Sequence, residues 1–348
     1  MAIHHKGKII GLTALILLIA GSMTAYRFYD YIYDMNLSVN NRENPFLYIP
    51  TNSAFDDVCL LLEEAGLNDM ESFRWVAGKM NYPAKVKAGR YRLTDGMSNI
   101  ELVRMLRSGR QIPVKVIFNN IRLNTQLAGA VTTSIEADSA SVMALLTDSA
   151  YLAERFKLTP QTVLSLFIPN TYEFLWNASA TDFMDRMSRE YDRFWTENRR
   201  QKAQEAKLTP LQASILASII EEETQMDSEK PVMAGVYINR LNRGIPLQAD
   251  PTLKYALGDF TIRRVLNSHK KIQSPYNTYL NAGLPPGPIC IPSIASIDAV
   301  LNYGKHDYLF FCAKEDMSGY HNFARTLQQH SRNAQAYQKA LNSKRIYR

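Results

Sequence analysis

Three consecutive glutamates, Glu221, Glu222 and Glu223, follow an apolar run and are the residues whose types and spacing most suggest chemistry. Glu223 lies three residues beyond Ile220 and seven beyond Leu216, so it continues the apolar face of a helix. Glu221 falls on a flank of that face, and Glu222 points away from it. Desolvation raises the pKa of a carboxyl group on a buried face, and a glutamate protonated near neutral pH can act as a general acid.

The same pattern also has a purely structural interpretation. Acidic residues at a helix end are commonly solvated or paired with arginine, and helical spacing alone does not separate this alternative from the catalytic one. The helix itself has clear start signals. Thr209 is the expected N-cap, Pro210 takes the first helical position, and Gln212 completes a capping box.

Four further segments combine turn-forming residues with aromatic and short polar side chains, and we expect them to be loops. Sugar sites are built in this way, because flat sugar rings stack on tyrosine while amides and carboxylates bind hydroxyl groups. The segments are LQADPT (247–252), SPYNTY (274–279), GLPPGPI (283–289) and GYHNFA (319–324). Together with Glu221, the candidate substrate-binding or supporting residues are Gln248, Asp250, Tyr276, Asn277 and His321. A loop-stabilising or salt-bridge role is the alternative for each of them.

The N-terminus has the pattern of a membrane anchor. Residues 1–8 carry two lysines and no acid, and residues 9–26 form an uncharged apolar run just long enough to span a bilayer core. A cleaved signal peptide is the alternative, although its apolar region is usually shorter. The positive-inside rule keeps the lysines in the cytoplasm and places the rest of the chain across the membrane, which in a bacterium is the periplasm.

Composition excludes some classes of protein. The net charge of +7, from 40 basic and 33 acidic residues, is spread along the chain without an arginine-rich block, so nucleic acid is not an expected partner. Cys59, Cys290 and Cys312 lack metal-ligand spacing and are expected to be buried thiols, with a Cys290–Cys312 bridge as a minor alternative. The histidines form no zinc motif, so no metal site is expected.

The 348 residues allow two domains with cores of their own. Residues 27–45 are polar and Asn-rich, which favours a tether. Residues 46–112 have the order strand, helix, helix, strand, helix, which predicts a small α+β module. Residues 113–348 begin with a strand, continue with helices around an aromatic-rich loop at 166–176, and end with a strand and a polar helix. The expected fold class is therefore α+β, with a transmembrane helix before the two domains.

Taken together, these segments resemble the YceG-like family of endolytic murein transglycosylases, which are membrane-anchored enzymes. The resemblance covers nearly the whole chain and rests on KAGRYRLTDGMS, FIPNTYEF, LASIIEEET, VYINRLNRGIPLQADPT, SPYNTYLNAGLPPGPI and HNFARTLQQH. It implies a LysM-like module at 46–112 and a catalytic domain at 113–348. The family's essential acid is the second glutamate of an E-x-E-T signature, which is Glu223 here. Asn170 replaces an aspartate common in FIPNTYEF of relatives, so no acid-base role is expected there.

The resemblance also implies an activity, namely cleavage of nascent peptidoglycan strands between N-acetylmuramic acid and N-acetylglucosamine. The product has a 1,6-anhydro end, which terminates strand elongation. A lone inward carboxylate, Glu223, suits this reaction, whereas a hydrolase commonly uses two. Tyr172 and Glu173 are further candidates for the border of the groove, and aromatic packing is the alternative role for Tyr172. The implied location is the inner membrane, single-pass, with the catalytic domain in the periplasm. Peptidoglycan synthases and divisome proteins are candidate partners, and no cofactor is expected. The alternatives are a catalytically silent peptidoglycan-binding scaffold and a hydrolase.

Overall fold

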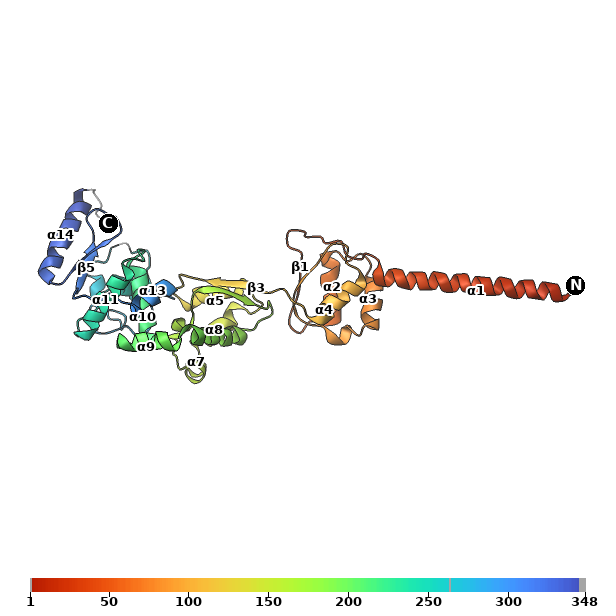
Figure 1. The fold of residues 1–348 in the computed structure, drawn as a ribbon, viewed down its shortest axis with the longest axis horizontal. Helices are drawn as coiled ribbons and strands as arrows, with labels where there is room; N and C mark the ends of the chain where they lie inside the picture. Colours follow the sequence, from red (N-terminus) through yellow and green to blue (C-terminus); the bar gives the residue numbers. More distant parts are fainter. Residues whose placement is uncertain (1, 263, 344–348) are drawn as a thin grey trace. The chain divides into compact units, whose positions relative to one another are not determined.

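The computed structural model describes residues 2–262 and 264–343, and the chain divides into two compact units (Figure 1). Unit 1 comprises the residues up to Lys115 together with Glu173–Ala178, and unit 2 comprises Val116–Tyr172 and the residues from Ser179 on. The division falls close to the boundary expected after residue 112. Helices combined with small two-stranded sheets confirm the predicted α+β class.

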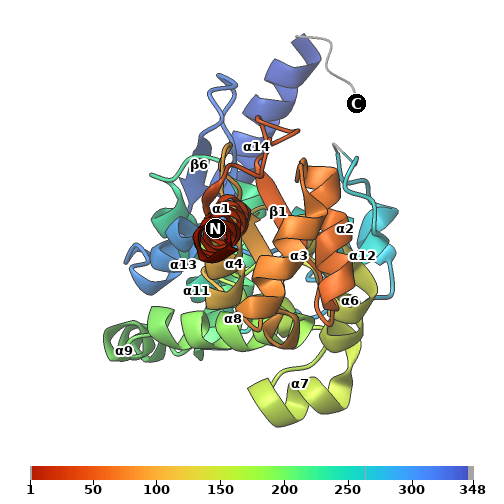
Figure 2. The ribbon, with the colours of Figure 1, turned by 90° about the vertical axis from the view of Figure 1, so that its right-hand side faces the viewer.

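Unit 1 begins with a long helix, α1 (Ala2–Tyr33). Within it, Gly11–Tyr33 is long and apolar enough to cross a membrane, with a mean hydropathy of 1.4. The span expected at residues 9–26 is therefore part of a longer continuous helix. The C-terminal end of α1 packs beside α3 and α4 (Figures 1 and 2), where the rings of Phe28 and Trp75 stack with their centroids 4.9 Å apart.

The segment 27–45, expected to be a tether, is instead largely packed against unit 1. Its first residues complete α1, and Leu37 and Val39 are buried in the core of the unit. The amide of Asn36 is also buried and donates a hydrogen bond to Asn99 Oδ1 at 2.7 Å. The asparagine content suggested solvation, but the alternation of Leu37 and Val39 gives the segment one apolar face, as in a strand.

The rest of unit 1 has the predicted order of elements. β1 and β2 pair in antiparallel fashion, and Leu62, Phe73 and Leu102 are buried in the core between them and the helices. Gly66 ends α2 with a φ of 107°, a left-handed conformation that glycine adopts readily. The elements are β1 (Phe46–Ile49), α2 (Phe55–Ala65), α3 (Met70–Lys79), η1 (Pro83–Lys85), β2 (Gly89–Arg92) and α4 (Asn99–Ser108).

Unit 2 is mostly helical, and α10 lies in its core. All residues from Ala213 to Ile220 are buried, and α10 packs against α9, α11, α12 and α13. The helices are α5 (Asn124–Thr132), α6 (Ser139–Thr147), α7 (Ser149–Phe156), η2 (Val163–Leu166), α8 (Ala180–Phe194), α9 (Glu197–Glu205), α10 (Pro210–Glu223), α11 (Lys230–Asn242), α12 (Asp250–Leu257), η3 (His269–Lys271), α13 (Ile294–Leu301) and α14 (Leu327–Ser343).

Short strands accompany these helices and form two-stranded ribbons. β3 (Val114–Phe118) pairs with β4 (Asn170–Phe174), and β5 (Phe310–Ala313) pairs antiparallel with β6 (His321–Ala324). In the second ribbon Phe310 lies opposite Ala324, and Ala313 lies opposite His321. α14 packs against both strands of this ribbon (Figure 1), which therefore has one covered face.

Several segments predicted as loops adopt regular structure. The aromatic-rich segment at 166–176 contains β4, in which the buried Tyr172 and Phe174 alternate with the exposed Thr171 and Glu173. Glu173, expected at the groove, belongs to unit 1. LQADPT runs into α12, whose first turn accommodates its proline, and GYHNFA contains β6.

GLPPGPI remains a loop, and one of its glycines is needed for packing. A Cβ atom at Gly287 would overlap the backbone carbonyl oxygen of Gln161. We expect Gly287→Ala to lower the free energy of unfolding by about 1–3 kcal/mol, the usual cost of an added methyl group in a packed site. Urea denaturation measures this value.

The matched control for Gly287→Ala is Gly129→Ala. Gly129 lies inside α5, and a Cβ atom there would meet no described heavy atom within 4 Å outside the local helix. This control should gain about 0.5–1 kcal/mol, since alanine favours the helix. Equal stabilities of the two alanine variants would contradict the close approach at Gly287.

Candidate active site

α10 determines where Glu223 points. Thr209 and Gln212 form the predicted capping box at its start, with bonds of 3.2 and 2.9 Å. Leu216 and Ile220, on the same face as Glu223, are fully buried. Glu223 is the last helical residue, because the backbone of the next residue is extended. Every residue from Ala213 to Ile220 is buried, so α10 is enclosed on all sides, and its contacts rather than the burial of one face distinguish Glu223 from the two glutamates before it.

The carboxyl group of Glu223 lies between the protein interior and a pocket. Its residue is partly exposed, and the hydroxyl group of Tyr237 on α11 donates a hydrogen bond to Glu223 Oε1 at 2.7 Å. Burial raises the pKa of Glu223 to about 7; the Tyr237 hydrogen bond opposes this increase, and the charge of Asp250 adds to it. Near neutral pH both protonation states are populated, so the group can donate a proton and accept one.

Removal of the Tyr237 hydroxyl group should raise the pKa of Glu223 further. The hydroxyl stabilises the ionised carboxylate, and a hydrogen bond to a charged group contributes about 1.5–3 kcal/mol, or roughly one pH unit or more. We expect this increase in Tyr237→Phe, measured by carboxyl ¹³C NMR titration. Tyr191→Phe, which removes a hydroxyl group from α8, should leave the pKa unchanged. A lower pKa in Tyr237→Phe would contradict the assigned role.

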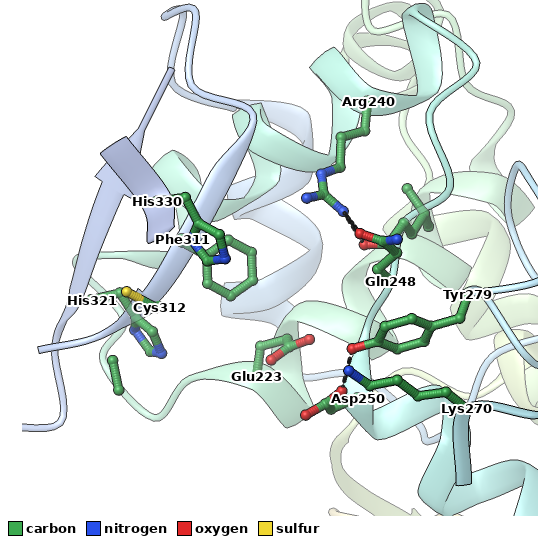
Figure 3. Close-up of a pocket in the computed structure, with 12 residues that line it drawn as sticks. Glu223, Arg240, Gln248, Asp250, Lys270, Tyr279, Phe311, Cys312, His321 and His330 are labelled. Atoms are coloured by element: carbon green, nitrogen blue, oxygen red, sulfur yellow. Dashed lines mark hydrogen bonds between the residues drawn. The ribbon is translucent and has the colours of Figure 1, made fainter. Parts of the chain in front are cut away.

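The pocket beside Glu223 has a volume of about 570 Å³. It brings Glu223 together with three other predicted residues, Gln248, Asp250 and His321. In Figure 3, Glu223 lies between the Asp250–Tyr279 pair and the β5–β6 ribbon. The lining residues are Glu223, Arg240, Leu247, Gln248, Asp250, Lys270, Tyr279, Phe311, Cys312, Ala313, His321 and His330. This mixture of charged, amide and aromatic groups suits a ligand with many hydroxyl groups.

Asp250 is a second carboxylate in the same pocket, so the expectation of a lone inward carboxylate is wrong. It occupies the first position of α12 and accepts a hydrogen bond from the Tyr279 hydroxyl group at 2.5 Å. The ammonium group of Lys270 lies 4.8 Å from the centre of the Tyr279 ring. Asp250 lies on a later segment than α10, so helical spacing along α10 does not place it beside Glu223.

Gln248 is held in a backbone conformation that is uncommon for residues other than glycine, with a φ of 52°. Its N–H donates to the carbonyl oxygen of Thr278 at 3.0 Å, and the following N–H donates to Thr278 Oγ1 at 3.0 Å. Beside it, buried Arg240 donates to the carbonyl oxygens of Leu309 and Leu247 at 2.6 and 2.7 Å. Arg240 therefore ties α11 to two walls of the pocket.

The other two glutamates of α10 lie on a different side of the helix. Burial acts to raise the pKa of Glu221, but hydrogen bonds from Ser293 and Ser296 outweigh it, so the pKa lies below its usual value. Glu222 accepts two bonds from Arg122, at 3.0 and 2.9 Å. These contacts match the salt-bridge and loop-stabilising alternative, and neither residue lines the Glu223 pocket.

Three further candidates have structural positions outside the pocket lining. Asn277 is fully buried, and its amide donates to the carbonyl oxygens of Lys270 and Ile272 at 2.9 Å. The ring of Tyr276 packs against Tyr255, with centroids 4.7 Å apart. Tyr172, expected at the groove, is buried in the core. The SPYNTY segment thus contributes Tyr279 to the pocket, while Asn277 fixes the shape of the loop.

The pocket also contains residues that the sequence analysis did not single out, namely Arg240, Lys270, Tyr279 and His330. Tyr237 lies directly behind Glu223. The sequence does contain a signal for two of these residues. Tyr237 and Arg240 are three residues apart, so helical spacing places them on one face of α11. No local pattern indicated Lys270 or His330.

The cysteines match their expected state only in part. Cys59 and Cys290 are buried, whereas Cys312 is partly exposed and lines the pocket. All three are free, so the minor alternative of a Cys290–Cys312 bridge is not found.

The fold and the site together are those of an α+β protein in which a glutamate at the end of a buried helix lines a polar pocket. Residues 47–336 match the model of the YceG-like family. The chain belongs to this family.

Named relatives agree with the family assignment. A Bacillus subtilis (strain 168) protein named endolytic murein transglycosylase is 29% identical over 311 residues, which cover 85% of each chain. A Streptococcus pneumoniae serotype 2 protein of the same name is 28% identical over 365 residues, covering 95% of this chain and 65% of that one. The crystal structure of a YceG-like protein from Listeria monocytogenes matches with a TM-score of 0.55 and 28% identity, over 82% of this chain and 97% of that one.

Proposed function

We propose that this protein is an endolytic lytic transglycosylase that cuts peptidoglycan glycan strands. The observation that carries the proposal is Glu223, a carboxyl group with a pKa of about 7 in a polar pocket. A leaving glycosidic oxygen needs a proton donor that is still protonated near neutral pH. The names of the relatives support murein as the substrate class.

In the proposed reaction, Glu223 first donates its proton to the glycosidic oxygen between N-acetylmuramic acid and N-acetylglucosamine. The bond from this oxygen to the muramic C1 breaks as C1 gains oxocarbenium character. The 6-hydroxyl group of the same sugar then forms a bond to C1 and returns its proton to Glu223. The product is a 1,6-anhydro end, and the enzyme regains its starting protonation state. The Asp250–Tyr279 pair provides a negatively charged wall that favours positive charge at C1.

Asp250 makes hydrolysis the chemical alternative, because paired carboxylates are the usual equipment of glycosidases. The test is mass spectrometry of products from purified glycan strands digested in ¹⁸O-labelled water. A lytic transglycosylase yields shortened strands with 1,6-anhydro ends that contain no ¹⁸O. Labelled reducing ends would favour a hydrolase. Binding without any shortening would favour the scaffold alternative.

The location forms a separate part of the proposal. We propose that α1 anchors the protein as a single span in the cytoplasmic membrane, since Gly11–Tyr33 has the length and hydropathy for one crossing. Residues 1–8 would then lie in the cytoplasm, and both units in the periplasm, where the substrate is polymerised. The LysM-like residues 46–112 would bind glycan. Peptidoglycan synthases and divisome proteins are the proposed partners, because an enzyme that ends strand growth must work where strands are made.

A further inference from the structure

His321 on β6 is held by a carboxylate from another element. Glu229 precedes α11, is 7% exposed, and accepts two hydrogen bonds from His321. The backbone N–H of His321 lies 2.8 Å from Glu229 Oε1, and the imidazole Nδ1 lies 2.8 Å from Oε2. The ring also meets Phe311 edge-on, with centroids 5.6 Å apart. These contacts fix both the position and the rotation of the imidazole.

The contact with Glu229 also determines which ring nitrogen carries the proton. An ionised carboxylate only accepts hydrogen bonds, so the proton between the two groups belongs to Nδ1 of His321. In the neutral ring, Nε2 is then left with a free lone pair on the side away from Glu229. His321 lines the same pocket as Glu223 (Figure 3), and its side chain is 13% exposed. The part of the ring available to a ligand in the pocket is therefore a hydrogen-bond acceptor.

We propose that Glu229 and His321 are a positioning pair, in which Nε2 of His321 accepts a hydrogen bond from a hydroxyl or amide N–H group of the glycan bound beside Glu223. The proposal rests on the proposed function and deepens it. Hydroxyl and acetamido groups of the sugars supply such donors, and an acceptor fixed in advance loses little conformational entropy on binding. Neither residue transfers a proton to the substrate, and Glu229 acts only through His321.

Glu229→Gln tests the pair with little change in shape. The glutamine oxygen can still accept the backbone N–H of His321, but its amide NH₂ group now faces Nδ1. Nδ1 must then accept, and the proton moves to Nε2, so a donor faces the pocket instead of an acceptor. Imidazole ¹⁵N and ¹³C chemical shifts distinguish the two forms. We expect the Nδ1–H form in the parent protein and the Nε2–H form in Glu229→Gln.

His306 provides an internal reference in the same spectrum. Its Nδ1 accepts a hydrogen bond from the N–H of Tyr308 at 3.1 Å, so its Nε2 carries the proton and donates to the carbonyl oxygen of Val232 at 2.9 Å. His306 should therefore show the Nε2–H form in the parent protein and in every variant. A change at His306 would identify a general disturbance of the fold, which the control variants described next should lack.

Ligand affinity provides the functional measurement. The probe is a tetrasaccharide of alternating N-acetylglucosamine and N-acetylmuramic acid without stem peptides, and Glu223→Gln is the background that leaves it uncut. Added Glu229→Gln should weaken binding about 10- to 100-fold, through the lost bond and the opposed donors. Glu190→Gln, an isosteric change on α8 where the carboxylate pairs with Arg186, should leave the affinity unchanged. With His321→Ala present, Glu229→Gln should cause no additional loss.

Two results would contradict the proposed role of Glu229 and His321. One is an Nε2–H form of His321 in the parent protein. The other is an equal loss of affinity from Glu229→Gln in the presence and in the absence of His321→Ala. Failure of the proposed function is recognised separately, by glycan cleavage that persists in Glu223→Gln. The chemical shifts of His321 do not depend on cleavage, so each outcome identifies which of the two statements is wrong.

Discussion

Glu223→Gln should abolish the formation of 1,6-anhydro ends while the protein stays folded. Glutamine preserves the shape of the side chain and can still accept the Tyr237 hydroxyl hydrogen bond. It cannot donate a proton to the glycosidic oxygen or accept one from the 6-hydroxyl group. General acid–base catalysis contributes about 100- to 10,000-fold per step, and Glu223 serves both steps, so we expect a loss at the upper end of this range or beyond. Mass spectrometry of digested glycan strands measures it.

The matched control for this substitution is Glu222→Gln. It changes the neighbouring glutamate of the same helix turn, whose carboxylate binds Arg122 outside the pocket. We expect Glu222→Gln to lose some stability but to keep its activity within a few-fold. Comparable losses of activity in the two variants would contradict a specific role for Glu223.

Stability should separate the two variants as well. The folded-state pKa of Glu223, about 7, lies above the ordinary glutamate value of about 4.3, so the folded protein binds more protons than the unfolded chain between these values. Stability from this group is therefore lost as pH rises from about 4.3 through about 7. Glu223→Gln lacks this loss and should melt no lower than the wild type at pH 8. If Glu223→Gln melted at a clearly lower Tm than the wild type at pH 8, the ionised Glu223 carboxylate would not be destabilising in the folded protein.

The pH dependence of kcat/KM should show a large effect with the same origin. Only the protonated form of Glu223 donates the first proton, so kcat/KM should fall about tenfold per pH unit above about 7. By pH 9 the expected decrease is about 100-fold. In Tyr237→Phe the midpoint of this decrease should move to higher pH, because the hydroxyl group no longer stabilises the carboxylate. A wild-type profile that stays flat from pH 6 to pH 9 would exclude Glu223 as the acid.

Local signals predicted the elements of the fold well where caps and apolar spacing agreed. The capping box marked the start of α10, and the stripe through Leu216 and Ile220 pointed to Glu223, although the helix is buried on all sides from Ala213 to Ile220 and not on one face alone. The order of strands and α-helices at 46–112 was also predicted, whereas the short helix η1 was not. These features depend only on neighbours in the sequence.

What the sequence did not predict depends on contacts between distant segments. β4 and β6 are short strands that gain their hydrogen bonds from partners elsewhere in the chain. Arg240, Tyr279 and His330 meet in one pocket although they come from three separate segments. Asn277 looked like a sugar ligand by composition, yet its amide satisfies backbone carbonyl groups inside the loop. Residue type alone does not show which polar groups the fold itself uses.

The pKa of Glu223, measured by ¹³C NMR titration of the side-chain carboxyl groups, tests directly whether this residue is the acid. We expect one carboxyl signal with a midpoint at about pH 7 that is absent from Glu223→Gln. If the signal that disappears in Glu223→Gln titrates near pH 4.3, as in an unperturbed glutamate, the carboxyl group is ionised at neutral pH and does not serve as the acid.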